Sequence, residues 1–249
     1  MKMRTLTFIL LSLFIMNQSF TRNIETDSFN AKSGDPVTVH FIQHASFYLT
    51  FKGMTIYADP VNYEGVDYKK LPKADIILIT HDHYDHLDIH AIADVSTPNT
   101  KIFCNHIVYK ALGTGTPLDN GDEIAFSLAP VPALTIDIMI EAVPAYNITE
   151  GREIYHPKGR DNGYILTLGG TRIYIPGDCE VMTEMSQFKD IDVAFLPINQ
   201  PYTMTVDQAI RAAIVIEPAI LYPIHYGDTD LTGLSVLKKD GIEVRIFKM

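Results

Sequence analysis

The sequence has few cysteines and fewer basic than acidic side chains. Its 249 residues include two cysteines, Cys104 and Cys179, which are too few for a disulfide scaffold. With 20 basic and 30 acidic residues the formal net charge is −10, whereas a general affinity for nucleic acid or anionic membranes requires positive charge. The contents of 47% hydrophobic and 20% charged residues exclude a disordered or collagen-like chain. We therefore expect a globular protein that binds no nucleic acid.

Long hydrophobic runs are also missing. The main apolar stretch, Phe8–Met16, follows Lys2 and Arg4 and is interrupted by Ser12. Nine helical residues span only about half of a bilayer core, so a stable membrane anchor is not expected. The pattern is typical of a signal peptide over residues 1–20 and predicts an exported, periplasmic protein. The alternative is a disordered start before a cytoplasmic domain.

Short strand-like segments, rich in β-branched and aromatic residues, recur from residue 37 onward. The run Ala74–Thr80 is apolar almost throughout, as expected of a strand buried on both faces. Ile191–Pro197 and Ala219–Ile224 have the same character, and Val206–Glu217 between them has the pattern of a helix. Many strands with few long helices predict sheets that are covered by helices.

No linker, repeat or low-complexity segment interrupts the sequence after residue 36. We therefore predict a single domain over residues 37–249, preceded by a linker over residues 21–36. The sequence locates no interface between copies of the chain, so it leaves the oligomeric state open.

A cluster of histidines and aspartates directly follows the Ala74–Thr80 run. It reads HDHYDH and contains His81, His83, Asp85 and His86. Neutral imidazole and carboxylate are preferred ligands of Zn²⁺ and similar divalent ions, and a turn lets such closely spaced residues point toward more than one centre. The alternative is a solvated polar loop or a pH-sensitive histidine patch. The residue types and their spacing favour a metal site.

Two more strand ends supply residues of the same kind. Asp178 ends the segment YIPGD, and His225 ends the segment YPIH. Alone, Asp178 fits a helix N-cap equally well, and His225 fits a hydrogen-bonded core histidine. Because sites in α/β proteins gather in loops beyond buried strands, we predict that both residues join the HDHYDH cluster.

The HDHYDH segment, the segment that ends in Asp178 and the segment that ends in His225 occur in this order along the chain. With this order the sequence resembles the metallo-β-lactamase superfamily over essentially all of residues 37–249. Further segments resemble its branch that includes L-ascorbate-6-phosphate lactonase and many metal-dependent hydrolases: His44–Phe47, Asp59-Pro60, Asn162–Tyr164 and Leu196-Pro197 with Tyr202–Met204. The resemblance implies an α/β (α+β) fold, a four-layer αββα sandwich with metals at one edge of its two sheets.

The family's ligand positions fall here on residues of suitable chemistry. The resemblance implies two divalent ions, zinc first and manganese as the alternative, with these ligands: His81 and His83 on the first ion, Asp85, His86 and His225 on the second, and Asp178 bridging both. His44 and Asp59 are expected to support the ligands, since metal-bound imidazoles donate their other N–H to a carboxylate or carbonyl. Cys179 is expected to be a small buried residue.

The third histidine of the family's first site is replaced by Asn147. An asparagine amide is a weaker ligand than imidazole. Nine residues on, His156 in the segment YHPKG offers a replacement ligand or a residue beside the metals. The alternative is a loop histidine that faces water, and the sequence leaves open whether Asn147 or His156 completes the first site.

The resemblance implies a dinuclear metal-dependent hydrolase. Two ions that share a carboxylate lower the pKa of a bound water from about 15.7 to near 7, and the bridging hydroxide attacks a carbonyl carbon or a phosphorus. The sequence has no G-x-S-x-G motif, consistent with a reaction that needs no protein nucleophile. The expected substrate is a small molecule with an ester, lactone or phosphodiester bond.

Four residues are candidates for direct roles in this chemistry. Asp178 bridges the ions and Asp85 positions the attacking water, while Tyr202 or His156 donates a hydrogen bond to the oxyanion or the leaving group. The alternative function, motivated by Asn147, is a non-catalytic or single-metal ligand-binding member of the same fold.

Overall fold

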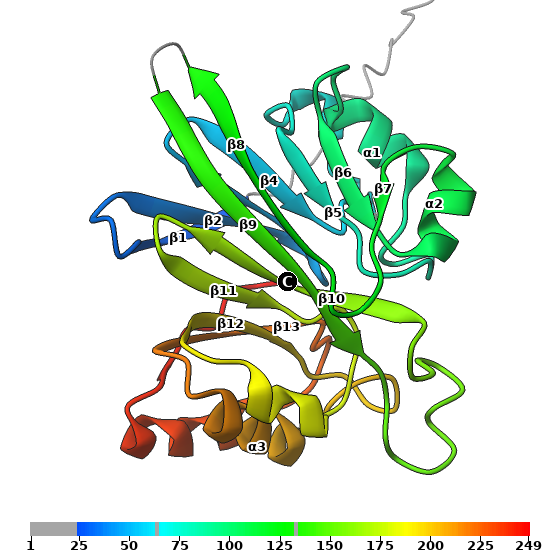
Figure 1. Cartoon of the computed structure of the whole chain (residues 1–249). Helices are drawn as coiled ribbons and strands as arrows, with labels where there is room; N and C mark the ends of the chain where they lie inside the picture. Colours follow the sequence, from blue (N-terminus) through cyan, green and yellow to red (C-terminus); the bar gives the residue numbers. More distant parts are fainter. Residues whose placement is uncertain (1–23, 63–64, 132–133) are drawn as a thin grey trace, which may run out of the picture.

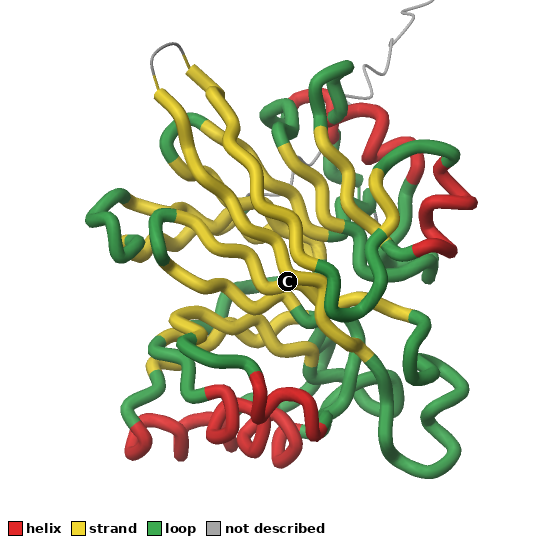
Figure 2. The backbone as a smooth tube through the Cα atoms, viewed as in Figure 1, coloured by secondary structure: helices red, strands yellow, loops and turns green. Residues whose placement is uncertain are grey.

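The computed structural model describes residues 24–62, 65–131 and 134–249. Two seven-stranded sheets face each other, with helices on both outer faces (Figures 1 and 2). The predicted signal peptide over residues 1–20 lies outside the described residues. Within the described ranges, no helix is long and apolar enough to cross a membrane.

The first sheet contains the N-terminal strands in sequence order: β1 (Glu25–Asn30), β2 (Pro36–Gln43), β3 (Ser46–Phe51), β4 (Met54–Ala58), β5 (Ile76–Leu78), β6 (Lys101–Cys104) and β7 (Thr116–Pro117). Strands β1 to β4 pair antiparallel and β4 to β7 pair parallel. The outer face is covered by η1 (Tyr68–Lys70), α1 (Ile89–Val95) and α2 (His106–Leu112).

The second sheet contains the C-terminal strands, also in sequence order: β8 (Glu123–Val131), β9 (Leu134–Ala145), β10 (Asp161–Leu168), β11 (Thr171–Ile175), β12 (Ile191–Pro197), β13 (Ile220–Ile224) and β14 (Glu243–Val244). The helices η2 (Thr183–Gln187), α3 (Val206–Ile216) and η3 (Thr232–Asp240) cover its outer face. In Figure 1, α3 lies on the opposite side of the two sheets from α1 and α2.

Side-chain alternation along the strands explains the layers. In β5, Ile76 and Leu78 point into the core between the sheets, whereas Ile77 points into the layer beneath α1 and α2. Period-two alternation of this kind places every second residue on the same face. Across the central core, Phe47 of β3 stacks on Phe195 of β12 with ring centroids 4.2 Å apart. The predicted αββα sandwich is therefore confirmed.

The predicted linker over residues 21–36 is wrong where the structure describes it. Strand β1 pairs with β2 along its whole length, and Phe29 and Ala31 are buried in the central core. Asp27 accepts hydrogen bonds from the Tyr222 hydroxyl at 2.8 Å and from Arg245 at 2.9 Å. The folded domain therefore begins before residue 37, and contacts with the C-terminal part of the chain fix its first strand.

Candidate metal centre

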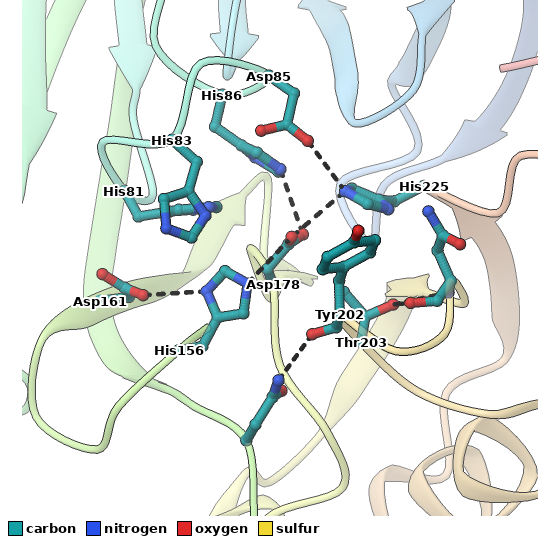
Figure 3. Close-up of polar contacts among 12 residues, drawn as sticks. His81, His83, Asp85, His86, His156, Asp161, Asp178, Tyr202, Thr203 and His225 are labelled. Carbon is teal, nitrogen blue, oxygen red and sulfur yellow. Dashed lines mark hydrogen bonds and ion pairs between the residues drawn. The ribbon is translucent and has the colours of Figure 1, made fainter. Parts of the chain in front are cut away.

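The residues of the predicted site gather where strands of both sheets end (Figure 3). The HDHYDH segment follows β5, Asp178 follows β11, and His225 directly follows β13. In the first sheet, the turn between β2 and β3 supplies His44. The N–H of His225 donates to the carbonyl of His44 at 2.8 Å, which joins the two sheets at this edge.

Atoms that could ligate a metal form three overlapping groups, and within each group they lie within 4.8 Å of one another: His81, His83 and His156; His44, Asp85, His86 and His225; and His81, His86 and Asp178. The carboxylate of Asp178 lies between the first two groups. Its Oδ2 is 3.4 Å from His156 Nε2 and 3.3 Å from His225 Nε2, and its Oδ1 is 3.3 Å from His86 Nε2. One carboxylate thus faces both groups.

Several of these atoms are buried without a hydrogen bond. Within the part of the chain that the structure describes, this is true of His81 Nε2, His86 Nε2, both ring nitrogens of His225 and Asp178 Oδ1. Buried polar atoms in proteins nearly always have a partner. Imidazole and carboxylate lone pairs that converge at such short distances fit divalent cations.

Known proteins resemble this chain over most of its length. A family described as "Beta-lactamase superfamily domain" matches residues 38–225. A UPF0173 metal-dependent hydrolase of Pyrococcus abyssi is 32% identical over 208 residues, which cover 76% of this chain and 84% of that protein. The chain belongs to the metallo-β-lactamase superfamily. It is a metal-dependent hydrolase, as the motifs predict, and the comparison adds that it is related to the UPF0173 family.

Solved structures share the fold. A candidate metal-dependent hydrolase from Parabacteroides distasonis is 52% identical, with a TM-score of 0.83 over 91% of this chain and 100% of that chain. Igni18, a metallo hydrolase from Ignicoccus hospitalis, has a TM-score of 0.64 over 85% of this chain and 95% of that chain. Its 23% identity indicates a common fold alone. The αββα architecture is that of the metallo-β-lactamase superfamily.

The structure brings His156 close to His81 and His83, as one of the sequence alternatives expected. The side chain of Asn147 takes part in loop contacts instead. Its Nδ2 donates to the carbonyl of Tyr202 at 2.7 Å, and its backbone N–H donates to the carbonyl of His156 at 2.9 Å. His156 is buried, so it is not a loop histidine that faces water. In this chain, where Asn147 stands at the position of the family's third histidine, an imidazole is therefore available from farther along the loop.

Asp59 orients two of the imidazoles, in agreement with its predicted supporting role. Its Oδ2 lies 2.8 Å from His86 Nδ1 and accepts from the Thr80 hydroxyl at 2.7 Å. Because that hydroxyl donates to Asp59, it accepts from His81 Nδ1 at 2.9 Å. Both rings thereby turn Nε2 toward Asp178, as metal-ligating histidines require.

Asp161 is a supporting residue that the sequence reasoning missed. It is fully buried at the start of β10, and its Oδ2 lies 3.2 Å from His156 Nδ1. Arg160 donates to the same carboxylate and lies 3.1 Å from His83 Nε2. The only local signal was its position, directly before the Asn162–Tyr164 motif. Asp161 supports His156 as Asp59 supports His86.

His44, Tyr202 and Cys179 lie around the cluster. His44 Nε2 is 3.1 Å from Asp85 Oδ2, so His44 contacts an expected ligand, and it also belongs to one of the groups that could hold a metal. Tyr202 is 45% exposed, and its ring centroid lies 5.0 Å from that of Tyr155. In Figure 3 its hydroxyl points in the direction of Asp85 and His225. Cys179 is a free and buried thiol, as expected.

Ion pairing sets the charges of the central carboxylate and its partners. Burial by itself would raise the pKa of Asp178, but the charges of His225 and His86 hold that pKa well below its usual range. For His225 the signs are reversed: burial by itself would lower its pKa, but the carboxylate of Asp178 raises that pKa to about 9. Without metal, these shifts favour an ionised Asp178 beside a protonated His225, whereas burial lowers the pKa of His81 and favours its neutral form. A divalent cation would replace the proton on His225.

Three residues of the centre have backbone angles in the left-handed region. The φ angles are 57° for His44, 41° for Asp59 and 49° for His225. Non-glycine residues adopt this region uncommonly, although Asp and His do so more readily than most. Such conformations cluster at functional sites and persist only where the surrounding structure imposes them. Here the strand ends impose them at the edge where the two sheets meet.

Gly177 lets Asp178 approach the HDHYDH segment closely. Its φ is +64°, and an added Cβ would lie 2.7 Å from Thr80 Cβ and 3.1 Å from the Asn162 carbonyl oxygen. We expect Gly177→Ala to lower the free energy of unfolding by about 1–3 kcal/mol through overpacking and backbone strain. Chemical denaturation measures this loss.

A second glycine provides the matched control. Gly113 has a similar φ of +70° with no atom within 4 Å of an added Cβ, so Gly113→Ala reports the backbone strain alone. Gly177→Ala should cost clearly more than Gly113→Ala and should also weaken metal binding. Equal losses in the two variants would show that close packing against Thr80 is unimportant.

Proposed function

We propose that this protein is a dinuclear hydrolase with two divalent ions, zinc first and manganese as the alternative. The observation that carries the proposal is the position of Asp178 between the group of His81, His83 and His156 and the group that contains His86 and His225. Each group offers at least three ligand atoms, which is the number that catalytic zinc sites take from the protein. The shared carboxylate would link the two ions.

Some residues of the centre would bind the ions, and others orient the side chains that bind them. When bound, the ions would supply Lewis-acid polarisation and an acidified water as nucleophile. Asp59 and Asp161 fix the imidazole orientations, so the ligands need little reorganisation. Asp85, partly exposed beside His225, would accept a hydrogen bond from the attacking water. Tyr202, whose hydroxyl points in the direction of Asp85 and His225 in Figure 3, would donate one to the oxyanion or the leaving group.

The proposed substrate is a small molecule with an ester, lactone or phosphodiester bond. A lactone is the first class to test, because the sequence resembles the branch that includes L-ascorbate-6-phosphate lactonase. An aliphatic lactone, an aryl ester and an aryl phosphodiester form a minimal panel that separates the three bond types. The acidic net charge of −10 disfavours nucleic acid as the phosphodiester.

Metal content tests the dinuclear centre directly. We expect about two zinc or manganese ions per wild-type chain and about one in His156→Ala, because the substitution removes one imidazole of the first group. Elemental analysis of the purified proteins measures the number. His90→Ala is the control, since His90 is exposed on α1, and it should retain two ions.

Other results would change the proposal in defined ways. Two ions in both wild type and His156→Ala would leave the dinuclear centre intact and assign His156 to the substrate side. One ion or none in the wild type would refute the dinuclear centre. That result would favour the alternative of a single-metal or non-catalytic ligand-binding protein.

A further inference from the structure

Glu180 is a buried carboxylate that lies outside the proposed ligand groups. It follows Asp178 by two residues and is completely excluded from solvent. Its Oε2 accepts hydrogen bonds from the backbone N–H groups of Ile148 at 2.8 Å and Thr149 at 2.7 Å. Its Oε1 accepts from the Thr149 hydroxyl at 2.8 Å and lies 3.4 Å from Arg152 Nη1.

All of these donors belong to the loop that leads to His156. Burying a carboxylate is costly unless it is hydrogen-bonded and paired with a cation, and this loop supplies both kinds of partner. The N–H of Glu180 also donates to the carbonyl of Tyr146 at 3.1 Å. The loop is therefore attached, at its start and along its first turn, to the segment that carries Asp178.

The same loop contacts the segment that carries Tyr202. Arg152 donates to the Gln200 side chain as well as to Glu180, and Asn147 donates to the carbonyl of Tyr202 at 2.7 Å. Glu180 thus connects three parts of the site: the strand end with Asp178, the loop with His156 and the segment with Tyr202. No other carboxylate in the described ranges accepts hydrogen bonds from Ile148 and Thr149.

We propose that Glu180 is a positioning residue, which holds the Asn147–His156 loop so that His156 reaches the first ligand group. Glu180 acts through His156 and, by way of Arg152, through the Tyr202 segment, without touching substrate or metal. The inference rests on the proposed function, since it assumes that the group of His81, His83 and His156 binds an ion.

Titration with Co²⁺, followed by its absorption spectrum, tests this role because the ion is a spectroscopic probe of each site. Wild type should bind Co²⁺ at two sites. The absorption change that is missing in His156→Ala is then assigned to the first site. In Glu180→Ala, we expect the first-site affinity to fall about 10- to 100-fold while the second site keeps its affinity. Glu243→Gln is the control, because Glu243 pairs with Arg245 at 2.8 Å on β14, and it should match wild type.

Glu180→Gln provides a graded variant in case Glu180→Ala fails to fold. Its amide oxygen can still accept from Ile148 and Thr149, but its NH₂ group cannot pair with Arg152, so a loss of about three- to tenfold at the first site is expected. Wild-type affinity in the folded variants, or equal losses at both sites, would overturn the positioning role and leave the dinuclear centre standing. A wild type that fills fewer than two sites would instead refute the proposed function, and the inference with it.

Discussion

Asp178→Asn is expected to lower kcat/KM for any hydrolysed substrate by about 10³-fold, which corresponds to about 4 kcal/mol. The Asp178 carboxylate contacts imidazoles of both ligand groups, at 3.4 Å from His156 and 3.3 Å from His86 and His225. The amide of asparagine has no negative charge and presents an NH₂ group to one of these groups. Both ions should therefore bind more weakly, and steady-state kinetics together with elemental analysis measure the two effects.

An aspartate far from the metal centre serves as a control for the general effect of losing one negative charge. Asp137 lies on an exposed face of β9 and accepts a hydrogen bond from Ser127 at 2.6 Å. Asp137→Asn should leave both the metal content and kcat/KM unchanged. An Asp178→Asn variant that keeps two ions and at least a tenth of wild-type activity would contradict a bridging role for Asp178.

Metal affinity is expected to fall steeply as the pH is lowered from about 9. Burial would lower the pKa of His225, but Asp178 raises it to about 9, so at pH 7 a proton occupies the ligand that a metal needs. Two pH units below that pKa, this competition alone weakens apparent binding about 100-fold. The pKa values of His86 and His156 are also raised, because neighbouring carboxylates outweigh burial. Zn²⁺ calorimetry in buffers with different ionisation enthalpies should therefore detect proton release.

The same pKa shifts predict how the stability of the metal-free protein depends on pH. A histidine whose pKa is raised by folding stabilises the fold fully below its unfolded pKa of about 6.5. That contribution is lost as the pH rises through the folded value, which is about 9 for His225. The temperature of half-unfolding of the metal-free protein should therefore decrease as the pH is raised from 6.5 to 9. The zinc-loaded protein should not show this decrease. A temperature of half-unfolding that rises over this range without metal would contradict the predicted ion pairs.

The sequence predicted the sheets and most of the residues that gather at the candidate metal centre, because the relevant signals are local. Alternating or continuous apolar residues identify strands such as Ala74–Thr80 and Ile191–Pro197, since burial on one or both faces requires those patterns. The HDHYDH segment contains four candidate ligands in six residues, so the turn after β5 suffices to bring them together. Asp178 and His225 each end a predicted strand, and ends of neighbouring strands meet at the same edge of a sheet.

Features that depend on contacts between distant segments could not be predicted. Strand β1 reads ETDSFN and has little apolar alternation, so its polar composition resembles a linker. It becomes a strand because β2 pairs with it and because Asp27 binds Tyr222 and Arg245, which are 195 and 218 residues away in the sequence. Tertiary contacts override weak local preference in such cases.

The sequence by itself indicated a metal-dependent hydrolase, because clustered imidazole and carboxylate side chains at strand ends are preferred ligands of divalent metals. Only the tertiary structure decided that His156 rather than Asn147 lies beside His81 and His83. The loop between these two residues can close in many ways, and local sequence does not select one. Its conformation depends on the buried carboxylates of Asp161 and Glu180, whose need for hydrogen-bond partners arises only once the two sheets have packed together.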